Sequence, residues 1–317
     1  MSACDWQPTA SRQALEARAR LLTQIRQFFA DRGVLEVEVP LLAAATVTDP
    51  HIDSIQASCN GRPCYLQTSP EFAMKRLLAS GSGPIYSLGK AFRNGESGRR
   101  HNPEFTMLEW YRPGFDDHRL MDEVEALIGS VLPLPEVQRL SYRELFLRYL
   151  DIDPHRVELG QLKGLARQQV EIDWEDDNRD TWLDMLITHA IEPQLGAGLT
   201  FIYDYPASQA ALARVCEDDR GQPVARRFEA YVGGMELANG YWELTDSQEQ
   251  ARRFQADLTR RQALGLAVYP EDQRLLAALA AGLPDTAGVA LGVDRLLMLA
   301  TGADSLQEVL AFPFSRA

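Results

Sequence analysis

The segment Pro103–Arg112 limits the folds open to this chain, because it places a carboxylate inside an alternation of apolar and aromatic residues. In an extended strand Glu109 would share a face with Phe105 and Tyr111, since alternate side chains point the same way. An unpaired buried carboxylate is costly, so Glu109 must meet a cation or a donor. Two kinds of partner for Glu109 remain open, namely an internal group such as an arginine and the amino group of a bound ligand. Phe105 and Glu109 would lie roughly 13 Å apart, which suits a groove with a stacked purine at one end and an amino group at the other.

Helix and strand patterns mix along the chain without a strict strand–helix–strand alternation. Apolar residues spaced by three and four predict a helix over 12–32, and alternation predicts a strand over 35–39 that Pro40 ends. Further helices are expected at 69–81, 141–150, 158–170, 180–192, 246–265 and 294–301, and further strands at 85–88, 105–112, 200–203, 228–232, 289–291 and 309–312. This mixture favours an α+β fold with a largely antiparallel sheet flanked by helices.

The composition is that of an ordinary folded chain, with 45% hydrophobic and 24% charged residues among 317. No run approaches the ~18–20 apolar residues that span a bilayer, and the first thirty residues contain no secretory signal. The four cysteines are too sparse for a disulfide framework and indicate reduced, cytoplasmic thiols. A zinc site at Cys59 and Cys64 would lack a second ligand pair. A net charge of −13 disfavours a long nucleic acid as the main partner.

Two later segments also place charges among apolar residues or glycines. Glu236 and Glu243 lie within Gly234–Leu244, and Gly292-Val293-Asp294-Arg295 places an arginine in the first turn of an expected helix, which suits an anion. Neither a GxxxxGK[ST] loop nor a GxGxxG turn after a strand is present, so a bound nucleotide would need arginines and an aromatic stack. Guanidinium groups suited to phosphate flank the first strand at Arg93, Arg99, Arg100 and Arg112, although the last three can equally be surface residues.

In this order the segments resemble the catalytic core of class II aminoacyl-tRNA synthetases, most closely the lysyl-specific branch. Residues 12–40 resemble motif 1, residues 92–109 resemble motif 2 and residues 292–295 resemble motif 3. Ser69-Pro70-Glu71 and Glu236-Leu237-Ala238-Asn239-Gly240 extend the match over nearly the whole chain. The resemblance implies the class II catalytic-core fold in a single domain, and a homodimer formed through motif 1.

A lysyl-tRNA synthetase carries an anticodon-binding OB domain ahead of this core, and no room for one is expected before residue 12. A stand-alone core is similar to the elongation factor P lysine ligases, which activate (R)-β-lysine with ATP and transfer it to a lysine side chain of elongation factor P. The resemblance therefore implies a cytoplasmic, AMP-forming ligase that uses ATP and Mg²⁺ and accepts α-lysine more weakly. Neither tRNA nor a membrane is an expected partner.

The resemblance also implies roles for individual residues. Arg93 would contact the α-phosphate and the substrate carboxylate, Arg295 would clamp the γ-phosphate, and Glu236 would hold magnesium. The remaining nucleotide contacts would come from Gly95, Glu96, His101, Asn102, Phe105, Leu237 and Gly292, with His101, Asn102 and Phe105 at the adenine. The amino-acid contacts would come from Ser69, Glu71, Glu109, Tyr111, Asn239, Glu243 and Ala290.

Within that last set, Glu109, Tyr111 and Glu243 would receive the distal ammonium. Glu71 would receive the other amino group, and Asn239 would orient the carboxylate.

Two positions depart from the lysyl pattern. Motif 2 usually has a glutamate two residues after its arginine, whereas this chain has Gly95 there and Glu96 one residue later. Ala290 stands where lysyl-tRNA synthetases have glycine. One methyl in a tight pocket can change discrimination by ~1–3 kcal/mol, which is consistent with a substrate other than α-lysine. Two alternatives remain open, namely a truncated lysyl-tRNA synthetase that charges tRNA and a non-catalytic paralogue that binds a partner or senses an amino acid.

Overall fold

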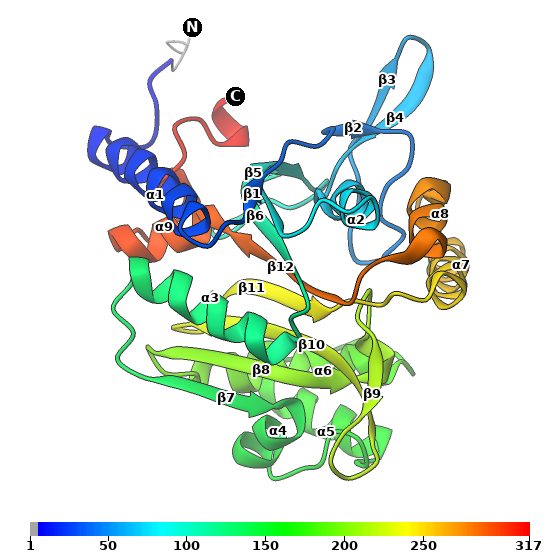
Figure 1. Cartoon of the computed structure of the whole chain (residues 1–317). Coiled ribbons are helices and arrows are strands. Elements are labelled where there is room, and N and C mark those ends of the chain that lie inside the picture. The colour runs from blue at the N-terminus through cyan, green and yellow to red at the C-terminus, as the bar shows by residue number, and fades with distance from the viewer. Residues whose placement is uncertain (1–5) are drawn as a thin grey trace, which may run out of the picture.

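A computed structural model describes residues 6–317, and a mixed sheet of nine strands runs through this part of the chain (Figure 1). All neighbouring strands pair antiparallel except the pairs β1–β5 and β7–β8, which are parallel. In spatial order the strands are β1 (Leu35–Glu36), β5 (Ile85–Phe92), β6 (Glu104–Pro113), β12 (Thr286–Gly292), β11 (Met235–Trp242), β10 (Pro223–Val232), β8 (Leu199–Pro206) and β7 (Val137–Ser141), with β9 (Val215–Glu217) beside β10.

One face of the central strands is covered by three helices that form the main core. They are α1 (Arg12–Ala30), α3 (Asp117–Val131) and α9 (Val293–Thr301). Trp110 of β6 is fully buried here, stacks edge-on against Phe29 of α1, and donates its indole N–H to Glu123 of α3 at 3.0 Å. Asp294 at the start of α9 pairs with Arg18 of α1 at 2.6 Å. These contacts bind the first and last helices of the chain to the same strand.

The two ends of the sheet are covered by separate groups of helices. At the β7–β8 end lie α4 (Tyr142–Leu150), α5 (Leu159–Gln169) and α6 (Arg179–Leu186), followed by a π-helical turn (Ile187–Ile191). At the other end α2 (Glu71–Ala79), α7 (Ser247–Ala263) and α8 (Gln273–Gly282) pack together, beside a small sheet of β2 (Leu42–Ala43), β4 (Arg62–Leu66) and β3 (Gln56–Cys59) (Figure 1).

The α+β class, the largely antiparallel sheet and most expected elements are confirmed. The strand expected over 309–312 is wrong, because the chain instead forms a 3-10 turn at Leu306–Glu308, with a capping box between Ser305 and Glu308, and buries Val309. The strand expected over 35–39 is only two residues long. The helix expected over 180–192 changes from α to π geometry after Leu186.

The expectations about membranes and thiols can be compared with the described residues. None of the helices in residues 6–317 is long and apolar enough to cross a membrane. Cys59, Cys64 and Cys216 are free thiols, and Cys4 lies outside the described residues.

We expect Gly240→Ala to lower the free energy of unfolding by about 1–3 kcal/mol, because overpacking a full core forces its neighbours to move. A Cβ at Gly240 of β11 would lie no farther than 3.0 Å from the Phe228 ring and from Val289. Gly89→Ala in β5 is the matched control, since a Cβ there meets nothing within 4 Å. Urea unfolding followed by circular dichroism measures both variants. Equal midpoints would contradict the close packing at Gly240.

Candidate active site

A cavity of about 1210 Å³ lies over the face of β6, β12 and β11 opposite to the main core. The strand register explains which side chains reach it. Glu109, Ala290 and Asn239 form one row across the three strands, and Tyr111, Gly288 and Tyr241 form the next. Side chains two residues apart share a face, so both rows point into the same cavity.

Nearly all the residues expected at the site line this one cavity. The exception is Gly95, which lies in the turn after β5 with a φ of +78°, a conformation that favours glycine. Its neighbour Glu96 reaches the wall and pairs with Arg93 at 3.5 Å. The expected residues that line the cavity are Ser69, Glu71, Arg93, Glu96, His101, Asn102, Phe105, Glu109, Tyr111, Glu236, Leu237, Asn239, Glu243, Ala290, Gly292 and Arg295.

One end of the cavity is rich in cationic and aromatic groups. The Arg93 guanidinium lies 5.2 Å from the centre of the Phe105 ring, and its Nε is buried with no hydrogen-bond partner among the described residues. Arg295, at the start of α9, contacts the His101 ring nitrogen at 2.7 Å. Burial and the Arg295 charge lower the pKa of His101. This end is therefore suited to an anion beside a flat ring.

Asn102 differs from its neighbours at this end. Its amide nitrogen donates to the Glu104 carbonyl at 2.6 Å, and its amide oxygen accepts from the Phe314 amide at 2.9 Å. The side chain is therefore used to hold the chain terminus against the strand, and it is less free for a ligand than Phe105.

Acidic groups occupy the middle of the cavity. Arg295 donates to the Glu236 carbonyl oxygen at 2.8 Å and lies 3.5 Å from its carboxylate. Burial and the nearby Glu229 carboxylate raise the pKa of Glu236. Glu229 accepts from Tyr205 and Tyr231 and, at 3.3 Å, from Asn239, whose own amide oxygen is buried without a partner in the described part of the chain. Glu229 is also paired with Arg227, whereas the Glu236 side chain is 39% exposed and lines the cavity, so a bound cation here would be met by Glu236.

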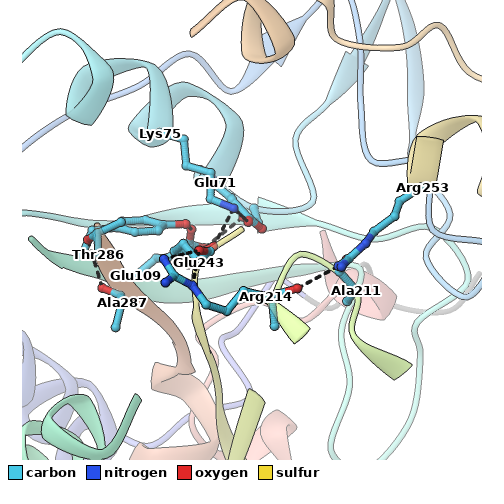
Figure 2. Close-up of polar contacts among 12 residues, drawn as sticks. Glu71, Lys75, Glu109, Ala211, Arg214, Glu243, Arg253, Thr286 and Ala287 are labelled. Atoms are coloured by element: carbon cyan, nitrogen blue, oxygen red, sulfur yellow. Dashed lines mark hydrogen bonds and ion pairs between the residues drawn. The ribbon is translucent and has the colours of Figure 1, made fainter. Parts of the chain in front are cut away.

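The far end of the cavity holds three buried or nearly buried carboxylates around one lysine (Figure 2). Lys75 of α2 pairs with Glu71 at 2.6 Å and with Glu243, which follows β11, at 2.7 Å. Glu109 is held differently, because it accepts from the Ser69 hydroxyl at 2.9 Å and the Tyr111 hydroxyl at 2.7 Å. The internal arginine considered as a partner for Glu109 is therefore not what the structure places there.

Burial shifts the ionisation of this acidic group. Burial and the nearby Glu71 raise the pKa of Glu109 to about 8. Burial also raises the pKa of Glu243, while the Lys75 ammonium opposes that shift and pairs with its carboxylate at 2.7 Å. The pKa of Tyr111 is raised well above its usual range by burial and by Glu109, so its hydroxyl keeps its proton and donates. Near neutral pH Glu109 therefore holds a proton that a bound cation would displace.

Several residues at the site were not identified from the sequence, among them Lys75, Gly288 and Glu229. Lys75 stands four residues after Glu71, and this spacing on a helix signals an ion pair. Gly288 has no such signal; it faces the cavity, and a Cβ there would lie 2.6 Å from the Glu243 carboxylate and would overlap the Tyr111 ring. Glu229 alternates with Tyr231 in a strand pattern, which resembles the Glu109–Tyr111 alternation.

Some charged residues near the motifs serve the fold instead. Arg112 pairs with Glu123 at 3.5 Å, and Arg99 pairs with Asp304 at the surface. Arg100 does line the cavity. Within residues 6–317 no cluster of three or more histidine, cysteine, aspartate or glutamate side chains is arranged to hold a metal by itself.

Comparison with known proteins gives a consistent result. The family model for class II tRNA synthetases (D, K and N) matches residues 2–316. A protein of Proteus mirabilis (strain HI4320) named elongation factor P–(R)-β-lysine ligase is 52% identical over 322 residues, covering 99% of this chain and 98% of its own. A protein of the same name from Photorhabdus laumondii is 52% identical and covers 99% of this chain and 98% of its own. Another, from Vibrio cholerae, is 52% identical and covers the whole length of both chains.

The cavity brings together the arginines of motifs 2 and 3 with glutamates from inside and outside the motifs, and the identity to these relatives extends over both chains almost completely. The chain belongs to the class II tRNA synthetase family, in the branch of the elongation factor P–(R)-β-lysine ligases.

Proposed function

We propose that this chain is an ATP-dependent ligase that activates (R)-β-lysine, and α-lysine more weakly, and transfers the lysyl group to a lysine side chain of elongation factor P. The observation that carries the proposal is the polarity of one cavity, with arginines and an aromatic ring at one end and three carboxylates at the other. The names of relatives that match over the full chain support the choice of acceptor.

The cationic end is proposed to bind ATP. Phe105 would stack on adenine, and Arg93 would neutralise charge at the α-phosphate with its unpartnered Nε. Arg295 would clamp the γ-phosphate, exchanging its present contacts with His101 and Glu236 for phosphate oxygens. Glu96, His101, Asn102, Leu237 and Gly292 would complete this wall.

Glu236 is proposed to hold Mg²⁺. The fit rests on the position of this carboxylate in the cavity wall, 3.5 Å from the Arg295 guanidinium, and on the preference of Mg²⁺ for one or two carboxylates together with substrate phosphates. A bound Mg²⁺ would neutralise phosphate charge.

The acidic end is proposed to bind the two ammonium groups of the amino acid. Glu109, Tyr111 and Glu243 would receive the distal ammonium, and Glu71 would receive the amino group nearer the carboxylate. The Asn239 amide oxygen, which lacks a partner among the described residues, would accept from the nearer amino group and so orient the carboxylate beside it. Arg93 would bind that carboxylate. Attack of that carboxylate on the α-phosphorus would release pyrophosphate, and attack of the acceptor amine on the acyl carbon would release AMP.

We further propose that the chain acts as a cytoplasmic homodimer with a single catalytic domain, and that tRNA is not its acceptor. Leu35 in the motif 1 segment, and Leu41 and Leu42 directly after it, are 59%, 43% and 46% exposed, which supports a contact with a second copy there. The free thiols of Cys59, Cys64 and Cys216 are consistent with a reducing compartment. Sedimentation at micromolar concentration should give the mass of two chains.

The reaction is tested by the intact mass of elongation factor P after incubation with the protein, ATP, Mg²⁺ and each lysine isomer. A gain of one lysyl group that requires ATP is expected, and Arg295→Ala provides the impaired control. A gain with no isomer would overturn the proposal. Acylation of tRNA in place of elongation factor P would instead favour a lysyl-tRNA synthetase.

Ala290→Gly should improve the use of α-lysine relative to (R)-β-lysine. The Ala290 methyl lies between Glu109 and Asn239 on the cavity face, where the two isomers place an amino group differently. Removing one methyl from such a pocket can change discrimination by about 10- to 200-fold. The ratio of kcat/KM for the isomers in ATP–pyrophosphate exchange measures the effect. An unchanged ratio would place selectivity elsewhere, such as in the position of Glu71.

The KM for lysine should fall by about tenfold or more between pH 6 and pH 8. Glu109, whose pKa is raised to about 8 by burial and by Glu71, is mostly protonated below that pH and must ionise to bind an ammonium group. Higher pH removes this proton in advance, so binding no longer has to displace it. Initial rates of pyrophosphate exchange measure the change, with the KM for ATP as the internal control. A lysine KM that is flat with pH would contradict the shifted ionisation.

A further inference from the structure

We propose that Lys75 is a positioning residue that determines substrate specificity. Its ammonium group adjusts the charge of the acidic end of the cavity so that this end suits a substrate with two ammonium groups. This inference rests on the lysine site proposed above. It assigns a role to a residue that belongs to none of the three motifs and does not line the cavity itself.

The first observation is how completely the lysine is enclosed. The Lys75 and Glu243 side chains are each 1% exposed, and that of Glu71 is 15% exposed. Around them pack apolar side chains of α2 and α7, including Phe72 and Phe254. A buried ammonium without partners would be very unfavourable, so Lys75 depends on both carboxylates to remain charged, and they raise its pKa.

The second observation is the charge balance of the cluster. When ionised, the three carboxylates and one ammonium leave two net negative charges at this end of the cavity. Lysine and β-lysine each carry two ammonium groups besides the carboxylate that reacts with ATP, so either restores neutrality. An amino acid with one ammonium would leave one buried charge uncompensated, and such charges are strongly unfavourable.

The third observation is how Lys75 joins the two proposed amine-binding positions. Its Nζ holds an oxygen of Glu71, assigned to the nearer amino group, and an oxygen of Glu243, assigned to the distal one, both within 2.7 Å. Glu109 is not held by Lys75, because Ser69 and Tyr111 donate hydrogen bonds to its two oxygens. Lys75 therefore fixes the spacing between the two positions, while Glu109 is oriented independently.

The test compares Lys75→Met, Glu243→Gln and the double variant with the wild-type protein in ATP–pyrophosphate exchange. Lys90→Met is the matched control, since Lys90 is a lysine of β5 that is 42% exposed and pairs with Glu104 at 3.2 Å. The substrates are (R)-β-lysine and α-lysine, and norleucine serves as a competing amino acid with a single ammonium. Binding of a non-hydrolysable ATP analogue reports an intact fold at the opposite end of the cavity.

Lys75→Met should raise the KM for both lysine isomers by at least about 100-fold, because one member of a buried charge pair is lost. Affinity for the ATP analogue should stay within about threefold of wild type. The double variant regains two net negative charges from Glu71 and Glu109, so it should bind lysine at least about tenfold better than Lys75→Met alone. A purely structural ion pair would give no such recovery of lysine binding.

Two results would overturn the role of Lys75. One is a lysine KM in Lys75→Met within about threefold of that of Lys90→Met. The other is a double variant whose loss equals the product of the two single losses. Should Lys75→Met fail to fold, the double variant decides alone, because removing both members of a buried pair is the milder change. In that case the proposal requires the double variant to bind the ATP analogue and to prefer lysine to norleucine. Wild-type protein without lysine-dependent exchange would instead reject the proposed function.

Discussion

The antiparallel pairing of β6, β12 and β11 is the constraint on which the rest of the structure depends. Its register places Glu109, Ala290 and Asn239 in one row, although these residues are separated by up to 181 positions in the chain. The alternate row, with Trp110 and Val289, points into the main core. A shift of one residue in one of these strands would exchange its two faces, and in β6 it would turn Glu109 into the core and Trp110 out of it.

Charge separation within a single cavity is the second organising feature. The arginines lie at the end formed by β5, β6 and the start of α9, whereas the carboxylates lie where α2 meets the sheet. Each group is supported before any ligand binds, with Arg295 against Glu236 and Lys75 between Glu71 and Glu243. Such preorganisation reduces the rearrangement needed when charge develops in a reaction.

Packing from the ends of the chain holds these strands in place. Asp294 accepts from the Thr106 amide at 2.7 Å and pairs with Arg18, so α9, β6 and α1 meet at one carboxylate. Asn102 ties the chain terminus to the same region through Phe314. The helix that carries Arg295 is therefore fixed by residues from the first helix and the final turn. Motif 3 can hold its arginine at the cavity because Asp294, its neighbour, is anchored to Arg18 and to the Thr106 amide.

The amino-acid sequence by itself determined the α+β class, most element positions and a set of site residues that nearly all line the cavity. These are local properties, since alternation identifies the strands and the motif order identifies the family, whose members share residue types at fixed positions. The tertiary structure decided which groups neutralise one another. Glu109 is met by Ser69 and Tyr111 and not by an arginine, while Lys75 pairs with Glu243 across 168 positions of the chain. No pattern along the chain contains that pairing, because the approach of α2 to the end of β11 is set by the packing of whole helices on the sheet.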